Sequence, residues 1–404
     1  MTQRVVAITG IGSLTPAGRG TEALWTHIVS GETCIAPIDS QKYFDPSRYA
    51  CQVAGQVPSF TEPRVQTKQI MTRTDRCSQL ALVAVLDALE MAKLPMDFRS
   101  EDSPVASERV LLMVATNAAG WTYLERGINN LWTKGRRAMS LHSLTAGFLA
   151  GPQGHVSIFF GIEGGTRTFV SERICGAYAL IEGAKAIQRG DAEVVIAGGT
   201  EAPLSPLSWA AYHTAYTLQP TREPTGMLIS EGSTFLILEE REHALRRGVP
   251  ILAEMSAWSR GTDPYPLQGS SKHPGKGFSQ IIHKSLALAD IQPAAIDVIF
   301  PAGPSFTQEN SIEETAISNV FGRPSSIAMS KAVLGHLQGA AVATDVAIAA
   351  LALDHQLIPP TQDALLHSHF STMNECTDSP LKHALILSGG LGGTHASLII
   401  SKSE

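Results

Sequence analysis

The sequence predicts a layered α/β fold built from two similar halves. Short apolar runs rich in β-branched residues alternate along the chain with longer segments of helical character. One of these segments, Gln79–Lys93, carries apolar residues on nearly every side, which is typical of a helix packed between other layers. With 404 residues, of which 44% are hydrophobic, the chain is long enough to bury a core of this kind.

The strands and helices of the first half follow from local pattern. Val5–Thr9 is a β-branched run that ends at Gly10, and Thr21–Ser30 is predicted to be a helix. Val110–Ala115 and Val194–Ala197 are uninterrupted apolar runs, the pattern of strands that are covered on both faces.

A charged segment closes the first half. Glu240–Gly248 is predicted to be a helix, because it ends in a Gly and Pro250 follows, a common signature of a helix C-terminus. We therefore divide the chain into an N-terminal half at residues 1–248 and a C-terminal half at residues 249–404. The two halves are expected to pack as one compact duplicated unit.

The same order of features occurs twice, as strand, loop, small-residue helix, strand and Gly-Gly. In the first half, Phe169–Gly176 precedes such a helix and the strand Val194–Gly199. In the second half, the corresponding segments are Ser326–His336, Leu337–Leu353 and Ala384–Gly393. An internal duplication of a layered α/β unit explains both series.

Bulk properties exclude several classes of protein. The net charge of -6 argues against a nucleic-acid binder that relies on bulk electrostatics. The sequence has no run of eighteen apolar residues and no signal peptide pattern, so we expect a cytoplasmic protein without a membrane span. The 5 cysteines are scattered and show no metal-binding spacing. Thr9–Leu14 lacks the third Gly of a dinucleotide site, and we expect neither a metal nor a cofactor.

Five segments occur in the order found in one enzyme family. They are Val5–Gly18, Met71–Leu82, Gly226–Ala244, Ser330–Ala341 and Ser388–Ile400. Together with the turn before the first small-residue helix, they resemble the β-ketoacyl-acyl carrier protein synthases, the condensing enzymes of fatty acid and polyketide assembly. This resemblance implies a thiolase-like fold, with duplicated halves in five α/β/α/β/α layers.

The resemblance also implies a catalytic Cys, which this chain lacks. In the condensing enzymes the nucleophile lies about seventeen residues before the Gly of a Gly-Asp break. Counting back from Gly190 leads to Arg173, and a guanidinium cannot take an acyl group as a thiolate does. Arg173 either plugs the former acyl site or is merely tolerated there. A cation close to a helix N-terminus is unfavourable, so we expect a carboxylate such as Glu172, or solvent, to offset it.

The other family positions are half retained. The first of two His residues, which act on the malonyl thioester, is replaced by Ala302. The second is present as His336, with its loop Lys as Lys331. Asp345, nine residues after this His, matches a family carboxylate and is expected to pair with Lys331. The gatekeeping Phe of the C-terminal turn is replaced by Leu391.

Cys175 and Gly392 complete the predicted pocket. Cys175 lies two residues past Arg173, about 200° around a helix, so its sulfur is expected to point away from the pocket that Arg173 faces. It is interpreted as a small packing residue, with a displaced nucleophile as the alternative. Gly392 lies in the Gly-rich turn whose backbone N–H groups, in the family, help to hold the developing oxyanion.

A subunit without nucleophile and first His is not expected to condense acyl groups by itself. The resemblance favours a chain length factor, the partner of an active ketosynthase in a type II polyketide system, which binds an acyl carrier protein and sets product length. In well-known chain length factors a Gln replaces the Cys, so Arg173 leaves the product open: polyene, aryl polyene, aromatic polyketide or unusual fatty acid. One alternative is a malonyl-carrier-protein decarboxylase or weak condensing enzyme that uses His336 and Lys331. The other is a non-catalytic acyl-carrier scaffold.

Overall fold

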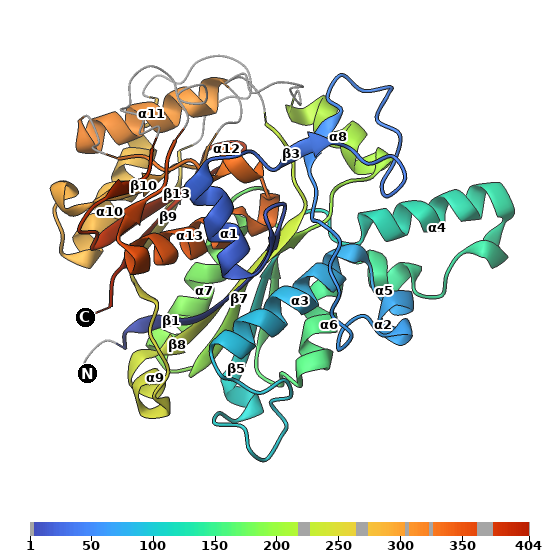
Figure 1. The fold of residues 1–404 in the computed structure, drawn as a ribbon, viewed down its shortest axis with the longest axis horizontal. Helices are drawn as coiled ribbons and strands as arrows, with labels where there is room; N and C mark the ends of the chain where they lie inside the picture. The colour runs from blue at the N-terminus through green and yellow to red at the C-terminus, as the bar shows by residue number, and fades with distance from the viewer. Residues whose placement is uncertain are drawn as a thin grey trace.

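The computed structural model describes residues 4–216, 227–263, 274–303, 307–322, 326–361 and 375–403. In these segments the principal strands form one ten-stranded mixed sheet (Figure 1). In spatial order its strands are β10 (Val298–Phe300), β13 (His383–Gly390), β14 (Thr394–Ser401), β9 (Ala253–Thr262), β1 (Val6–Thr15), β8 (Gly232–Glu240), β7 (Val194–Glu201), β5 (Val110–Ala115) and β6 (Thr166–Phe169), with β2 (Gly18–Arg19) beside β1. Two short pairs lie apart, β3 (Ile35–Pro37) with β4 (Val53–Gly55) and β11 (Leu357–Ile358) with β12 (Thr377–Asp378).

The sheet consists of an N-terminal and a C-terminal part. They join where β1 pairs with β9 through Ala7 with Glu254 and Ile8 with Ala253. The pairs β5–β6, β5–β7 and β10–β13 are parallel, whereas the other main pairs are antiparallel. The mixed sheet agrees with the predicted α/β class.

Helices complete five layers. They are α1 (Gly20–Ser30), α2 (Lys68–Arg73), α3 (Arg76–Met91), α4 (Trp121–Lys134), α5 (Ser143–Gly147), α6 (Gly151–Phe160), α7 (Cys175–Arg189), α8 (Pro206–Tyr216), α9 (Arg241–Arg247), α10 (Lys276–Ala289), α11 (Thr307–Phe321), α12 (Ser330–Leu334) and α13 (Ala341–His355). α3 and α6 cover the outer face of the N-terminal strands, and α10 and α11 cover the C-terminal strands. α7 and α13 lie between the two sets of strands (Figure 1). No helix of the described segments is long and apolar enough to cross a membrane.

Capping residues set the helix ends that the sequence pattern predicts only roughly. α3 starts three residues before the predicted Gln79, because the Asp75 carboxylate accepts hydrogen bonds from the N–H groups of Cys77 and Ser78. α9 is confirmed: Glu240 caps its start, and Gly248 adopts a left-handed conformation at its end.

β1 is longer than predicted, because its glycines do not end the strand. They lie where α3 approaches the sheet: a Cβ on Gly12 would come within 1.7 Å of the Ala84 carbonyl oxygen. The strand therefore continues to Thr15. The repeat also differs in detail, because the predicted strand of the second half is reduced to a single bridge between Ile327 and Ile299.

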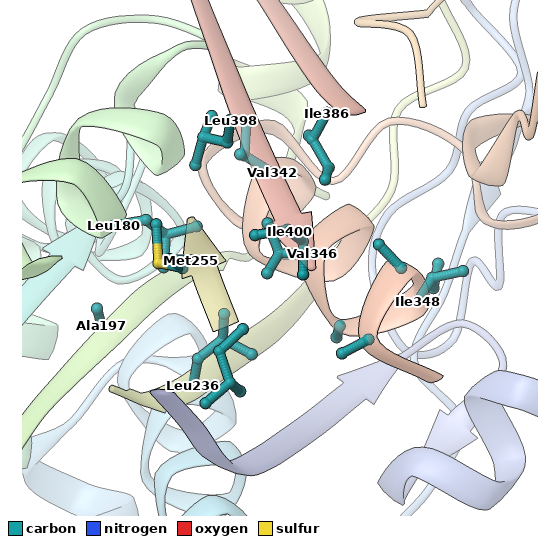
Figure 2. Close-up of a cluster of buried hydrophobic side chains, with 14 of the residues drawn as sticks. Leu180, Ala197, Leu236, Met255, Val342, Val346, Ile348, Ile386, Leu398 and Ile400 are labelled. Carbon is teal, nitrogen blue, oxygen red and sulfur yellow. The ribbon is translucent and has the colours of Figure 1, made fainter. Parts of the chain in front are cut away.

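The core lies where the two middle helices meet both sets of strands. Figure 2 shows Leu180 of α7 and Val346 of α13 in one apolar cluster, with Leu236 from the N-terminal strands and Leu398 from the C-terminal strands. These side chains are inaccessible to solvent. Because this packing fixes α7 and α13 against each other, it also fixes the loops that precede them, and those loops carry the candidate site.

Candidate active site

In the described part of the chain, five elements converge on one small cavity: the turn between β6 and α7, the helix α10, the loop after β10, the start of α11, and the Gly-rich turn between β13 and β14. The cavity measures about 20 Å³, which is room for roughly one water molecule. Its lining includes Arg173, Ala302, Glu309, Gly390 and His395. Two sequence-predicted positions, Arg173 and Ala302, therefore share a wall of the same space.

Arg173 is buried and bound to two carboxylates. Its side chain is only 4% exposed. Nε donates to Glu172 Oε1 at 2.6 Å, and a terminal nitrogen donates to Glu309 Oε2 at 2.6 Å. Burial disfavours the guanidinium charge, but the two carboxylates outweigh it and raise the pKa of Arg173. Glu172 is thus the carboxylate predicted to offset the positive charge of Arg173, and Glu309 is a second carboxylate that does so.

Glu172 also links the turn before α7 to the Gly-rich turn. It has a positive φ of 57°, which is uncommon for a residue other than Gly. Its Oε2 accepts a hydrogen bond from the Leu391 backbone N–H at 2.9 Å, and its backbone oxygen accepts one from Asn117 Nδ2 at 3.0 Å. One carboxylate thus binds both Arg173 and the turn that holds Leu391.

Lys331 and Asp345 form the predicted pair. Lys331 Nζ lies 2.5 Å from Asp345 Oδ2 and also donates to the Pro301 carbonyl oxygen at 3.0 Å. Ser330 donates its hydroxyl to the other oxygen of Asp345. The pair is buried between α12 and α13 and fixes the loop that leads to His336.

His336 is a buried, neutral imidazole. Its Nδ1 accepts a hydrogen bond from the Gln338 N–H at 3.0 Å, which places the remaining ring proton on Nε2. Burial, followed by the charges of Lys331 and Arg173, holds the pKa of His336 well below its usual value. A neutral ring with its proton on Nε2 can donate one hydrogen bond from that atom.

Ala302 stands where the resemblance implies the first His. The structure places the carboxyl group of Glu313 beside this position. Glu313 accepts the Ala302 N–H at 2.7 Å and the Gly303 N–H at 3.4 Å, and burial raises its pKa to about 7. The residues after Gly303, where the family tail is eroded, lie outside the described part of the chain. His395 lines the cavity too, stacked on Phe278 at 4.1 Å between ring centroids.

Cys175, Asp345, Leu391 and Gly392 lie outside the described lining of this cavity. α7 begins at Cys175, so Arg173 belongs to the preceding turn and the helical angle between the two does not apply. Cys175 Sγ lies 3.7 Å from Asn117 Oδ1. Its thiol is fully buried, and burial raises its pKa, which disfavours a reactive thiolate. Leu391 is exposed on the surface turn.

Sequence reasoning missed Glu309, Glu313 and His395. Glu309 is 136 positions from Arg173 along the chain, and neither belongs to a spacing motif that would connect them. Only the fold, which brings the start of α11 over the turn before α7, reveals the pair. The missed residues supply two of the carboxyl groups and the imidazole that close the site.

We expect Glu201 and Glu313 to make the folded state less stable as the pH rises. Both are buried, and burial raises the pKa of each from 4.5 to about 7. Because the folded state holds these protons more tightly, the stabilisation is full below pH 4.5 and is lost as the pH rises through about 7. Each group contributes roughly 3 kcal/mol to this loss. Urea unfolding between pH 4.5 and 8 measures it.

The Glu201→Gln and Glu313→Gln variants are the controls. Each neutral amide removes one titrating group, so the unfolding free energy should depend less on pH than that of the wild type. Identical slopes for wild type and both variants would contradict the assignment.

Comparison with known proteins agrees with this fold and these motifs. The chain matches the model of the beta-ketoacyl synthase N-terminal domain at residues 3–244 and that of the C-terminal domain at residues 252–364. It is 29% identical to a putative polyketide beta-ketoacyl synthase 2 of Streptomyces halstedii, with 99% of this chain and 97% of that protein aligned. It is 27% identical to 3-oxoacyl-[acyl-carrier-protein] synthase 2 of Coxiella burnetii, over 100% and 99% of the two chains.

Solved structures show the same fold. A chain of the ishigamide ketosynthase/chain length factor superimposes with a TM-score of 0.86 at 24% identity, and the alignment covers 100% of both chains. A beta-ketoacyl synthase from Burkholderia phymatum STM815 gives a TM-score of 0.87 at 21% identity, over 99% of this chain and 100% of that one. The five layers are those of the thiolase-like fold, and the chain belongs to the beta-ketoacyl synthase family.

Proposed function

We propose that this chain is a non-catalytic chain length factor. It pairs with an active ketosynthase, and the pair elongates a polyketide of the polyene, aryl polyene or aromatic class on an acyl carrier protein. The observation that carries this proposal is the buried Arg173, held between Glu172 and Glu309 where the family resemblance places the nucleophile. A guanidinium with two carboxylate partners cannot form a thioester.

The rest of the site supports the same conclusion. With the Arg173 side chain in place, the cavity of about 20 Å³ is far smaller than an acyl group requires. Ala302 has no imidazole to act on a malonyl thioester, so of the two family His residues only His336 is retained, and its Nδ1 is bound to its own loop. Lys331 donates to Asp345 and Pro301, contacts that stabilise the loop. The retained family residues, His336 and Lys331, therefore have structural partners. No contact in the described part of the chain specifically supports the alternative of a malonyl-carrier-protein decarboxylase.

An exposed apolar surface supports association with a second subunit. We call it the α4–α6 face; its large exposed apolar side chains are Trp132, Leu141, Leu144, Phe148 and Ile158. Val170, also exposed, directly follows the edge strand β6. α4 contacts α5, α5 contacts α6, and α6 contacts β6. In Figure 1, α4 extends away from the body of the molecule. Apolar surface of this extent in a folded chain commonly marks a protein interface.

The edge of the sheet lies beside this face. β6 stands at one end of the strand order and pairs with β5. A strand at a sheet edge presents backbone N–H and C=O groups to which another strand can pair. A partner subunit of the same fold, packed about a two-fold axis, would cover both the edge and the α4–α6 face. The solved structure named as a ketosynthase/chain length factor is consistent with such a pair.

The test is co-expression with an active ketosynthase, taken from the gene neighbourhood of this chain. Native mass spectrometry should show a 1:1 heterodimer, and after incubation with an acyl carrier thioester, intact-mass analysis should find the acyl group on the partner subunit only. The isolated chain should remain unacylated. Robust acylation of the isolated chain would overturn the proposal.

A further inference from the structure

The Glu172 carboxylate accepts a backbone N–H of the Gly-rich turn, the turn to which the family resemblance assigns oxyanion binding. Its Oε2 accepts the Leu391 backbone N–H at 2.9 Å, and its Oε1 is held 2.6 Å from Arg173 Nε. The same side chain lies so close to the Gly-rich turn that a Cβ on Gly390 would come within 3.0 Å of its Oε2. These contacts hold the Glu172 carboxylate against the backbone N–H of Leu391, although the two residues are 219 positions apart in the chain.

Acyl transfer needs that amide free. When a thiolate attacks a thioester carbonyl, the C–S bond forms as the C=O electron pair moves onto oxygen. The oxyanion then collapses, expels the carrier's thiolate and leaves an acyl-cysteine; a proton from solvent converts the expelled thiolate to a thiol. Backbone N–H groups aimed at the oxygen stabilise this intermediate, and loss of one such donor slows reactions of this kind about 10²–10³-fold.

We propose that Glu172 is a second obstacle to acylation at this site, independent of the missing nucleophile. It engages the Leu391 N–H and places a negative charge where the oxyanion would develop. A thiol introduced at position 173 would therefore stay unacylated as long as Glu172 is present. This inference rests on the correspondence of sites used in the proposed function. It assigns to Glu172 a blocking role that no family motif contains.

The experiment compares Arg173→Cys with the double variant Glu172→Ala/Arg173→Cys in the full chain. Two probes separate access from catalysis. Iodoacetamide alkylates an accessible thiol without an oxyanion hole, whereas hexanoyl-acyl carrier protein acylates it only if the oxyanion is stabilised. Intact-mass spectra, with the wild type correcting for its own cysteines, give both rates.

We expect iodoacetamide to modify both variants at similar rates, and acylation of the double variant to be at least 100-fold faster than that of Arg173→Cys. Equal acylation rates would overturn the proposal, and so would a double variant that is alkylated but not acylated faster. Both variants lack Arg173, the cation that pairs with Glu309. Each variant is therefore also made with Glu309→Gln and checked by thermal unfolding. The pairing test of the proposed function uses the wild-type chain, so the two ideas fail separately.

Discussion

Replacing Arg173 by Met is expected to lower the free energy of unfolding by about 3–5 kcal/mol. The substitution keeps an extended side chain but removes the cation that neutralises Glu172 and Glu309. Arg173 is 4% exposed and Glu309 is 13% exposed, so solvent compensates poorly for the lost charge. The two carboxylates that now share the Arg173 guanidinium would then lose the cation between them. Urea unfolding followed by circular dichroism measures the change.

Two further variants locate the origin of this effect. The triple variant Glu172→Gln/Arg173→Met/Glu309→Gln removes all three charges and should recover most of the lost stability, because a neutral site has no uncompensated ion. Arg99→Met removes an Arg whose ion pair with Asp97 is about half exposed, and it should cost no more than ~1 kcal/mol. If Arg173→Met were as mild as Arg99→Met, the two ion pairs of Arg173 would not stabilise the fold.

The size of this effect bears on what the site is for. A position that had merely drifted after losing its nucleophile would not be expected to hold a buried cation between two carboxylates. Here the turn before α7, the start of α11 and the Gly-rich turn are connected through Arg173 and Glu172. Under the proposed function, this network fills the former acyl site and fixes its walls, which suits a subunit retained for its shape.

The sequence predicted the layers because their signals are local. The apolar run Val110–Ala115 is β5 without change, and the charged helix before Pro250 has the expected Gly end. Lys331 and Asp345 could be paired in advance because both match family positions, the Lys of the His loop and the carboxylate nine residues after the His. The patterns that predict β5 and α9 depend only on residues close together in the chain, and both elements form where these patterns place them.

The closing of the site could not be predicted, because it depends on distant contacts. Glu172 adjoins Arg173, yet its bond to Leu391 exists only once β13 and β14 bring their turn over the start of α7. The extent of β1 was also wrong, since Gly10 reads as a strand end but serves the close approach of α3. Nor does periodicity reveal the α4–α6 face, because a helix shows the same apolar stripe whether it packs inside its own fold or against a partner.

A single charge on the α4–α6 face is expected to abolish pairing with the ketosynthase. Phe148→Asp replaces an apolar side chain that is 63% exposed in the free chain, so folding should be little affected. In the heterodimer the new carboxylate would be buried without a partner, and the apolar contact would be lost. We expect the dissociation constant to rise at least ~100-fold, equivalent to about 3 kcal/mol, with loss of polyketide formation by the mixed subunits.

Leu288→Asp is the matched control for this prediction. Leu288 is 60% exposed on α10, in the outer layer of the C-terminal half, so the substitution makes the same chemical change at nearly the same exposure. Size-exclusion chromatography of the co-expressed subunits should show the heterodimer for Leu288→Asp and separate subunits for Phe148→Asp. If both variants paired normally, the α4–α6 face would not be the interface. If both dissociated, added charge rather than position would account for the loss. Only the selective result ties the apolar surface beside the β6 edge to the partner subunit of the proposed heterodimer.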